Sequence, residues 1–373
     1  MKTAAAKTRL HIAIAIVALL GTPVIGFAAP RPSLPRLPDS VKPAPRPRPP
    51  QPRPKAPAPP AKKPVQRKPV VLKETTFSGR KYLNIRQIGE MFGFRATISV
   101  NKEKLQAITL TTPRGEKIVF TAKKPVFQVS GTNATLSYPV VYQKGVFFLE
   151  KTDYTEFLEP LLRTSLLPRR EILRVVIDAG HGGKDQGASS GLLLEKSLNL
   201  IMARRVAAIL RKRGYNVIMP RNTDKTVTLE ERCKAAAAAR PDLFLSIHCN
   251  SAEDSSIHGI EVFIANPPGV PSFGTTNIGK KGASTPHQRT SALWAYYTQR
   301  ALVAATKAED RGIKRKQFKV VIDTPAPAML VELGFISNKA ERAKLIRADY
   351  QDKLAVAICD SIDKLKKTLK PKK

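Results

Sequence analysis

The second half of the sequence restricts the fold most, because short apolar segments alternate there with longer amphipathic ones. From Ile172 onward, strand-like segments such as 173–177 and 243–247 are separated by helix-like segments such as 195–213, whose apolar residues fall on one face. Strands that alternate with helices are typical of a layered α/β domain. We therefore predict an α/β fold with a twisted, mostly parallel sheet and helices on both of its faces. Further strands are expected at 215–219, 260–264, 318–322 and 329–331, and further helices at 229–240, 291–307 and 350–365.

Residues 1–29 have the pattern of an export signal. Lys2, Lys7 and Arg9 form a cationic start, and an uncharged apolar stretch and small residues follow. A retained membrane anchor is the alternative, but the apolar stretch is interrupted by Gly and Pro and is shorter than the ~20 residues of a spanning helix. We therefore predict a signal peptide and a location in the periplasm or cell wall. An exported protein is not expected to have nucleic acid as its partner.

Residues 30–70 are rich in proline and in positive charge. They hold 16 of the 31 prolines and 11 Lys or Arg, with a single acid, Asp39. Because such a stretch cannot form a core, we predict a disordered linker that extends as a solvated tether. The formal charge is +35 in all; without +3 from the signal segment and +10 from the linker, residues 71–373 carry +22. This charge favours anionic partners. The linker can be a mere spacer, and as a cationic tether it is also expected to contact an acidic wall or membrane surface.

Three segments follow the linker. Residues 71–165 show short alternating apolar runs punctuated by Gly, and they contain no cluster of His, Cys or paired acids, so we predict a small, non-catalytic α+β domain. Its expected helix is 85–92, and its expected strands include 107–110, 117–120, 126–129 and 146–149. Residues 170–366 form the predicted catalytic domain, and residues 367–373 form a basic tail.

Four residues with catalytic potential lie at the ends of predicted elements. His181 lies in a Gly-flanked turn after the strand 173–177, and His248 directly follows the strand 243–247. Glu332 ends another apolar strand, and Glu195 begins a helix. Because ligands of open α/β sheets gather at the carboxyl ends of the strands, we expect these side chains to meet at one edge of the sheet.

Two imidazoles and one carboxylate form a ligand set that holds hydrolytic Zn²⁺ and leaves a fourth position for water. The remaining carboxylate could act as a general base on that water. Residue type alone does not decide which of Glu195 and Glu332 takes which role. Each histidine could instead be an ordinary hydrogen-bonding residue, and Glu195 could simply stabilise the N-terminus of its helix.

The order of the surrounding motifs resembles that of the zinc-dependent N-acetylmuramoyl-L-alanine amidases. The matching segments are 178–188 with the sequence DAGHGGKDQGA, 221–224 with RNTD, 246–251 with SIHCNS, 259–262 with GIEV and 331–338 with VELGFISN. The resemblance implies that His181, Glu195 and His248 bind the zinc ion and that Glu332 is the catalytic base. It also implies hydrolysis of the amide between N-acetylmuramic acid and L-alanine in peptidoglycan, and some relatives use an activator protein.

The small domain also resembles a known module, the copper amine oxidase N-terminal-like or stalk domain. Residues 82–94 are similar to its strand-helix-Gly opening, and 146–150 followed by 154–162 repeat that unit. Nothing in this segment would bind copper, and the name of the module implies none.

Several alternatives remain open at this point. The chain could be a zinc peptidase that cuts within the stem peptide, an inactive wall-binding protein, or an exported binder of nucleic acid or lipopolysaccharide. Cys249 follows His248, but neighbouring strand residues point to opposite faces, so we expect it to pack in the core. His258 and His287 are the rival histidines.

Overall fold

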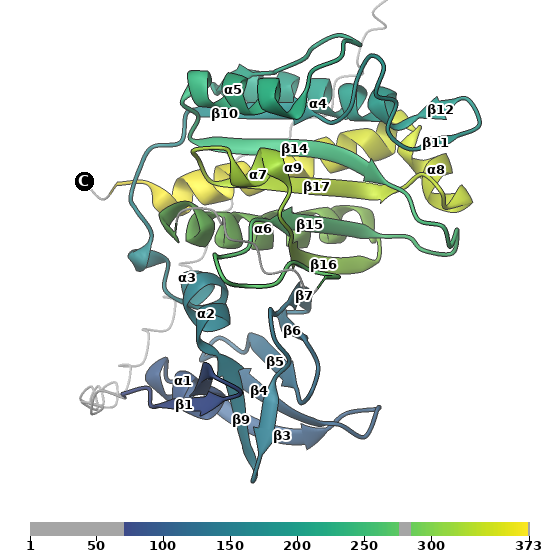
Figure 1. The fold of residues 1–373 in the computed structure, drawn as a ribbon. Helices are drawn as coiled ribbons and strands as arrows, with labels where there is room; N and C mark the ends of the chain where they lie inside the picture. The colour runs from purple at the N-terminus through teal and green to yellow at the C-terminus, as the bar shows by residue number, and fades with distance from the viewer. Residues whose placement is uncertain (1–70, 276–284, 372–373) are drawn as a thin grey trace, which may run out of the picture. The chain divides into compact units, whose positions relative to one another are not determined.

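The computed structural model describes residues 71–275 and 285–371 (Figure 1). The predicted signal peptide and the predicted linker lie outside the described residues. Within the described ranges, no helix has both the length and the apolar character that crossing a membrane requires.

A mostly parallel sheet forms the centre of the second half of the chain. Its strands run in the order β13-β10-β14-β17-β15-β16, and all neighbours are parallel except β15 and β17. The strands are β10 (Arg174–Ala179), β13 (Asn216–Ile218), β14 (Leu243–Asn250), β15 (Ile260–Ile264), β16 (Asp310–Arg315) and β17 (Ala328–Phe335). A two-stranded hairpin, β11 (Ser189–Ser190) and β12 (Leu193–Leu194), precedes the first long helix.

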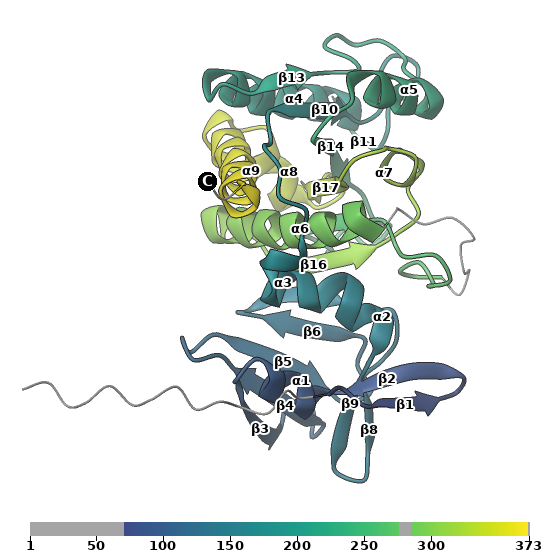
Figure 2. The ribbon, with the colours of Figure 1, turned by 90° about the vertical axis from the view of Figure 1, so that its left-hand side faces the viewer.

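Helices cover both faces of this sheet, as Figures 1 and 2 show. One face carries α4 (Glu195–Lys212), α6 (Thr285–Thr306) and α9 (Ala348–Leu369), and the other carries α5 (Leu229–Ala239) and α7 (Lys319–Ile322). The short helix α8 (Lys339–Leu345) follows β17. Alternate residues of β14 enter different cores: Leu245 and Ile247 pack under the first group of helices, and Phe244 packs under the second. The predicted α/β class is therefore confirmed.

Besides α8 and the hairpin β11–β12, which were not predicted, two further elements of this half differ from the sequence prediction. The segment 318–322, expected as a strand, forms the single helical turn α7. Its apolar residues Val320 and Val321 are both buried, so the run of apolar residues reflects burial rather than strand geometry. The strand β16 was not predicted, because Ile313 is its only large apolar residue.

The first half of the described chain is built mainly from antiparallel strands. One sheet contains β1 (Glu74–Phe77), β2 (Arg80–Asn84), β9 (Val146–Glu150) and β8 (Val141–Gln143). A meander contains β3 (Arg95–Val100), β4 (Gln106–Thr111), β5 (Lys117–Thr121), β6 (Val126–Val129) and β7 (Thr132–Thr135). The helical segments are α1 (Ile85–Met91), α2 (Lys151–Asp153), a π-helical turn (Tyr154–Leu158), α3 (Glu159–Leu162) and a 3₁₀ turn (Thr164–Leu166).

The two halves share one sheet. Strand β7 pairs in parallel with β16, so the meander extends the central sheet to eleven strands. A buried ion pair joins Asp153 to Arg315 at 2.6 Å, and the Asp310 carboxylate accepts a hydrogen bond from the Asn133 amide at 2.8 Å. These contacts cover β16, which would otherwise be an open edge. The boundaries 71–165 and 170–366 remain predictions.

Candidate metal centre

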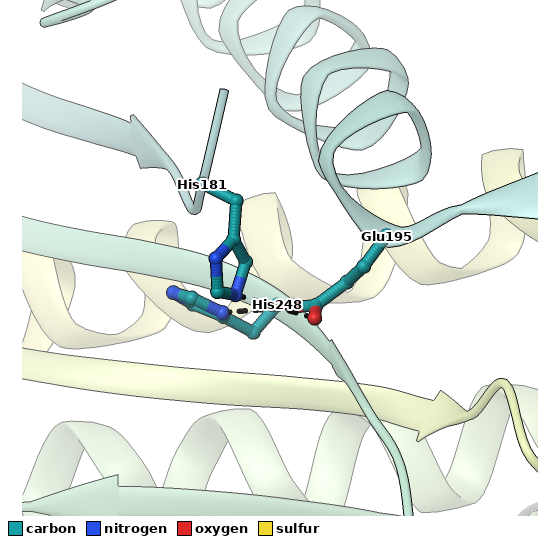
Figure 3. A group of neighbouring side chains, drawn as sticks. All are labelled: His181, Glu195 and His248. Carbon is teal, nitrogen blue, oxygen red and sulfur yellow. Dashed lines mark hydrogen bonds and ion pairs between the residues drawn. The ribbon is translucent and has the colours of Figure 1, made fainter. Parts of the chain in front are cut away.

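Three of the four predicted site residues converge at one edge of the sheet. Figure 3 shows the side chains of His181, Glu195 and His248 close together. Each offers a ligand atom, and these atoms all lie within 4.8 Å of one another. His181 follows β10, His248 lies near the end of β14, and Glu195 is the first residue of α4. Because β10 and β14 are parallel neighbours, their carboxyl ends bring the two histidines to the same place.

The Glu195 carboxylate lies between the two imidazoles. Its Oε2 is 3.2 Å from Nε2 of His181, and its Oε1 is 3.0 Å from Nδ1 of His248. Burial alone would raise the pKa of Glu195, but the hydrogen bonds to both histidines hold that pKa well below its ordinary value. The amide of Ala188 also donates to Oε2 at 2.9 Å. The site therefore favours the ionised carboxylate, which is the form that binds metals.

The turn that carries His181 is held by two buried arginines. His181 has a φ of +59°, a left-handed conformation that is uncommon for residues other than Gly. Arg221 donates to the carbonyl oxygens of Ala179 at 2.9 Å and Gly180 at 2.7 Å, and Arg232 donates to that of His181 at 2.6 Å. These bonds fix the carbonyl groups on both sides of the turn, so the surrounding fold supports the strained backbone.

Further polar residues orient the three side chains. Nδ1 of His181 is 2.8 Å from Oδ2 of Asp185, which leaves Nε2 to face Glu195. The side-chain amide of Asn199 donates to Oε1 of Glu195 at 3.1 Å. Partners of this kind fix the tautomer and the direction of metal-binding groups. Asp185 belongs to the Gly-rich segment noted in the sequence, but nothing in the pattern indicated its role.

Two glycines provide the space in which the side chains meet. A Cβ on Gly180 would lie 2.2 Å from Nε2 of His248, and a Cβ on Gly187 would lie 2.5 Å from Oε2 of Glu195. Both separations are far below van der Waals contact, and the second position also has a φ of +65°. Any larger residue at these two positions would displace the side chains of the site.

Glu332, the fourth predicted site residue, lies on the adjacent strand and outside the group of three. The prediction that it ends its strand was wrong, because β17 continues to Phe335. It is the register partner of His248 across β14 and β17, and it is only 8% exposed. Its Oε2 is buried and has no hydrogen-bond partner among the described residues. Burial, together with the negative charges of Glu195 and Glu261, raises the pKa of Glu332 well above its ordinary value.

A cavity of about 290 Å³ opens beside the two imidazoles. Its wall includes His181 and His248, the segment 226–229 that leads into α5, and Val320 of α7. The hydroxyl of Thr228 in that segment accepts from the Glu231 amide at 3.2 Å and so caps α5. The segment is thereby fixed next to the site.

The rival candidates lie elsewhere. His258 is exposed and pairs with Glu309 at 3.1 Å, and neither it nor His287 belongs to the group of three. Cys249 is buried in the core on the opposite side of β14, where burial raises the pKa of its thiol well above the ordinary value. Cys233, Cys249 and Cys359 are all unpaired.

The donor set suits a hydrolytic zinc ion. Two imidazole nitrogens and one carboxylate oxygen are ligands that Zn²⁺ accepts, and three protein ligands leave a position for water or substrate. The residues around the site fit this use, since Asp185 and Asn199 orient the donors and Gly180 leaves room for them. The ion pairs between Glu195 and the histidines show that the three donors face a common point.

Comparison with known proteins shows what the second half of the chain is similar to. Residues 175–364 match the N-acetylmuramoyl-L-alanine amidase family. The chain is 38% identical over 189 residues to the uncharacterised protein YqiI of Bacillus subtilis, which covers 51% of this chain and 82% of YqiI. It is 37% identical over 186 residues to the N-acetylmuramoyl-L-alanine amidase LytC of Bacillus subtilis, which covers 50% of this chain and 34% of LytC.

Among solved structures, the catalytic domain of CwlV, an N-acetylmuramoyl-L-alanine amidase from Bacillus (Paenibacillus) polymyxa var. colistinus, is 33% identical with a TM-score of 0.45. That match covers 52% of this chain and 97% of the CwlV domain. The chain thus spans about a third of LytC but nearly all of the CwlV domain. Since the family match takes in half of its residues, this chain belongs to the N-acetylmuramoyl-L-alanine amidase family.

Proposed function

We propose that this chain is a zinc-dependent peptidoglycan hydrolase that cleaves the amide between N-acetylmuramic acid and the L-alanine of the stem peptide. The observation that carries the proposal is the site itself. Two imidazoles and one carboxylate face a common point, and a second carboxylate is buried on the next strand without a hydrogen-bond partner among the described residues. Family membership supplies the bond that such a site would cleave.

In this proposal His181, Glu195 and His248 hold the metal, and Glu332 is the general base. The contacts support this division because Glu195 faces both imidazoles, whereas Oε2 of Glu332 has no hydrogen-bond partner among the described residues. A zinc ion bound there would acidify water and polarise the amide carbonyl.

Glu332 would take a proton from the attacking water and then deliver it to the nitrogen of the leaving L-alanine. A base with a raised pKa suits both steps, because it accepts a proton readily and holds it until the nitrogen leaves. Asp185 would keep Nε2 of His181 directed at the metal, and Arg221 and Arg232 would hold the turn that presents this imidazole.

The proposal includes export to the periplasm or wall. The signal peptide, the linker, the stalk-like resemblance of residues 71–165 and an activator protein remain predictions from the sequence. The charge of +22 on residues 71–373 suits a polymer whose stem peptides carry carboxylates.

Digestion of purified peptidoglycan, with and without a chelator, tests the proposal when the released fragments are identified by mass. We expect intact stem peptides with a free L-alanine amine, and no release when the metal is removed. Fragments cut between stem residues would instead identify a zinc peptidase. Binding of the wall without any hydrolysis would identify an inactive wall-binding protein.

A variant pair assigns the base. Glu332→Gln should retain zinc but lose roughly 10²- to 10⁴-fold in rate, the usual contribution of general base catalysis. Glu103→Gln, which changes an exposed carboxylate paired with Lys124, is the matched control and should leave the rate unchanged. Normal hydrolysis by Glu332→Gln would remove Glu332 from its proposed role.

A further inference from the structure

A row of cations and aromatic rings lies on β15, on β16 and in the segment that leads into α7. The ammonium of Lys314 is 5.7 Å from the ring centre of Phe263 and 4.6 Å from that of Phe273. The ammonium of Lys316 is 6.0 Å from the ring centre of Phe263 and 5.0 Å from that of Phe318. Aromatic faces attract cations, so the rings hold both ammonium groups in defined positions.

The row lies on the sheet face that carries Glu332. Glu332 is the register partner of Glu261 across β17 and β15, so their side chains share a face. Phe263 lies two residues after Glu261 and therefore on that same face, and its register partner on β16 is Lys314. The same face of the sheet therefore carries the proposed catalytic base on β17, Phe263 on β15 and Lys314 on β16.

The two lysines differ in their partners. Lys314 is buried and forms an ion pair with Glu261, so its charge is compensated. Lys316 is partly exposed and has no carboxylate partner within the described ranges. The residues 276–284 that the structure does not describe contain no Asp or Glu. The positive charge of Lys316 nevertheless acts on Glu332, whose pKa it lowers against the larger effect of burial.

We propose that Lys316 binds a carboxylate of the stem peptide and so makes the enzyme prefer substrates in which that carboxylate is free. The inference rests on the proposed function, because it assigns the substrate of that same site. The position fits, since Lys316 leads directly into α7, whose Val320 lines the cavity beside the imidazoles. The chemistry fits because an uncompensated, partly desolvated ammonium forms strong charge-assisted hydrogen bonds with a carboxylate.

The test compares two synthetic muramoyl peptides that differ only in whether their carboxylates are free or converted to primary amides. Zinc-loaded wild-type protein should have a KM for the free acid that is roughly tenfold lower, the worth of one charge-assisted hydrogen bond at a partly exposed site. Lys316→Gln should lose this preference by raising the KM for the acid more than the KM for the amide, so that the ratio of the two KM values approaches one. Lys316→Arg should retain most of the preference.

Lys319→Gln is the matched control. Lys319 is exposed and already paired with Asp323 at 2.7 Å, so its loss removes the same charge from the same region without removing an unpaired cation. If both variants weaken both substrates equally, the effect is a general loss of attraction and the proposal is wrong. It is also wrong if Lys316→Gln leaves the preference intact.

A binding measurement separates this inference from the proposed function. Calorimetry with zinc-loaded Glu332→Gln should show tighter binding of the acid than of the amide, and combining this variant with Lys316→Gln should abolish the difference. If wild-type protein fails to hydrolyse either peptide, the proposed function fails, while the binding difference still decides the role of Lys316. Equal binding of acid and amide would reject that role.

Discussion

Removing the Asp153 carboxylate should destabilise both halves of the described fold. Asp153 is fully buried, and Arg315 on β16 is 4% exposed. The carboxylate accepts hydrogen bonds from Nη1 of Arg315 at 2.6 Å and from the amide and hydroxyl of Ser137 at 2.9 Å and 2.8 Å. In Asp153→Ala, the guanidinium would keep its charge in a buried position and lose its only carboxylate partner among the described residues.

The cost follows from that unpaired charge. Breaking a buried ion pair by removing one partner typically costs about 3–5 kcal/mol, because the other charge stays buried without compensation. With an unfolding entropy of ~2.1 cal/mol/K per residue and about 300 folded residues, this cost lowers Tm by about 5–8 °C. The buried core runs through both halves and β7 pairs with β16, so we expect both halves to unfold in one transition. The lower Tm should therefore be seen for that single transition.

Thermal and urea unfolding followed by circular dichroism measure this effect. Glu103→Ala is the control: it breaks an exposed ion pair with Lys124 and should cost less than about 1 kcal/mol. The double variant Asp153→Ala with Arg315→Met removes both charges and should recover most of the lost stability. If Asp153→Ala costs no more than Glu103→Ala, the buried pair does not contribute as argued.

Three further predictions concern the site. Gly180→Ala should weaken zinc binding at least tenfold in a competition titration with a chromophoric chelator, because its Cβ would overlap the His248 ring. Gly191→Ala is the control, because a Cβ there would meet no atom within 4 Å. Asp185→Ala should weaken zinc binding about 10- to 100-fold in the same titration, because the partner that orients a ligand is lost. For metal-free protein, Glu332→Gln should raise Tm relative to the wild type, and the gain should grow as pH rises above about 4.5. The sign follows because folding raises the pKa of the wild-type carboxyl group, so the folded protein loses stability as pH rises above the pKa of the unfolded state. The neutral Gln side chain causes no such loss. Melting curves in chelator between pH 4.5 and 8 check this, and a gain that is constant across the range would contradict it.

The sequence allowed the fold class to be predicted because strands and helices of the second half bury apolar residues in their usual patterns. Strand β16 is the exception. Its buried Lys314 and Arg315 are compensated by Glu261 and Asp153, which lie far away in the sequence, so no local pattern could reveal it. The strand predicted at 318–322 was wrong for a different reason, because a short apolar run does not distinguish a strand from a helical turn.

The site shows the same limit: local patterns indicate some of its residues, but not those that reach it only through the tertiary fold. His181 follows β10 and His248 lies near the end of β14, where a sequence pattern can find them, and the structure brings both together with Glu195. Glu332 lies within β17, but it interrupts an apolar run and was found for that reason. Arg232 could not be found in this way, because it lies on α5 and reaches the His181 turn only through the tertiary fold. Its only local signal was a charged residue on a helix, which is typical of a solvated surface.

The proposed division of labour between the two carboxylates rests on their surroundings rather than on their residue type. Both are buried, which by itself would raise the pKa of each. Glu195 begins α4 between two imidazoles, and these partners hold its pKa low enough to keep it ionised for a metal. Glu332 lies in mid-sheet, where burial and the negative charges of Glu195 and Glu261 raise its pKa well above its ordinary value. Environments that separate the pKa values of two acids in this way are a general means of assigning their roles. In the proposed mechanism, the fold suits two glutamates of equal chemistry to different steps.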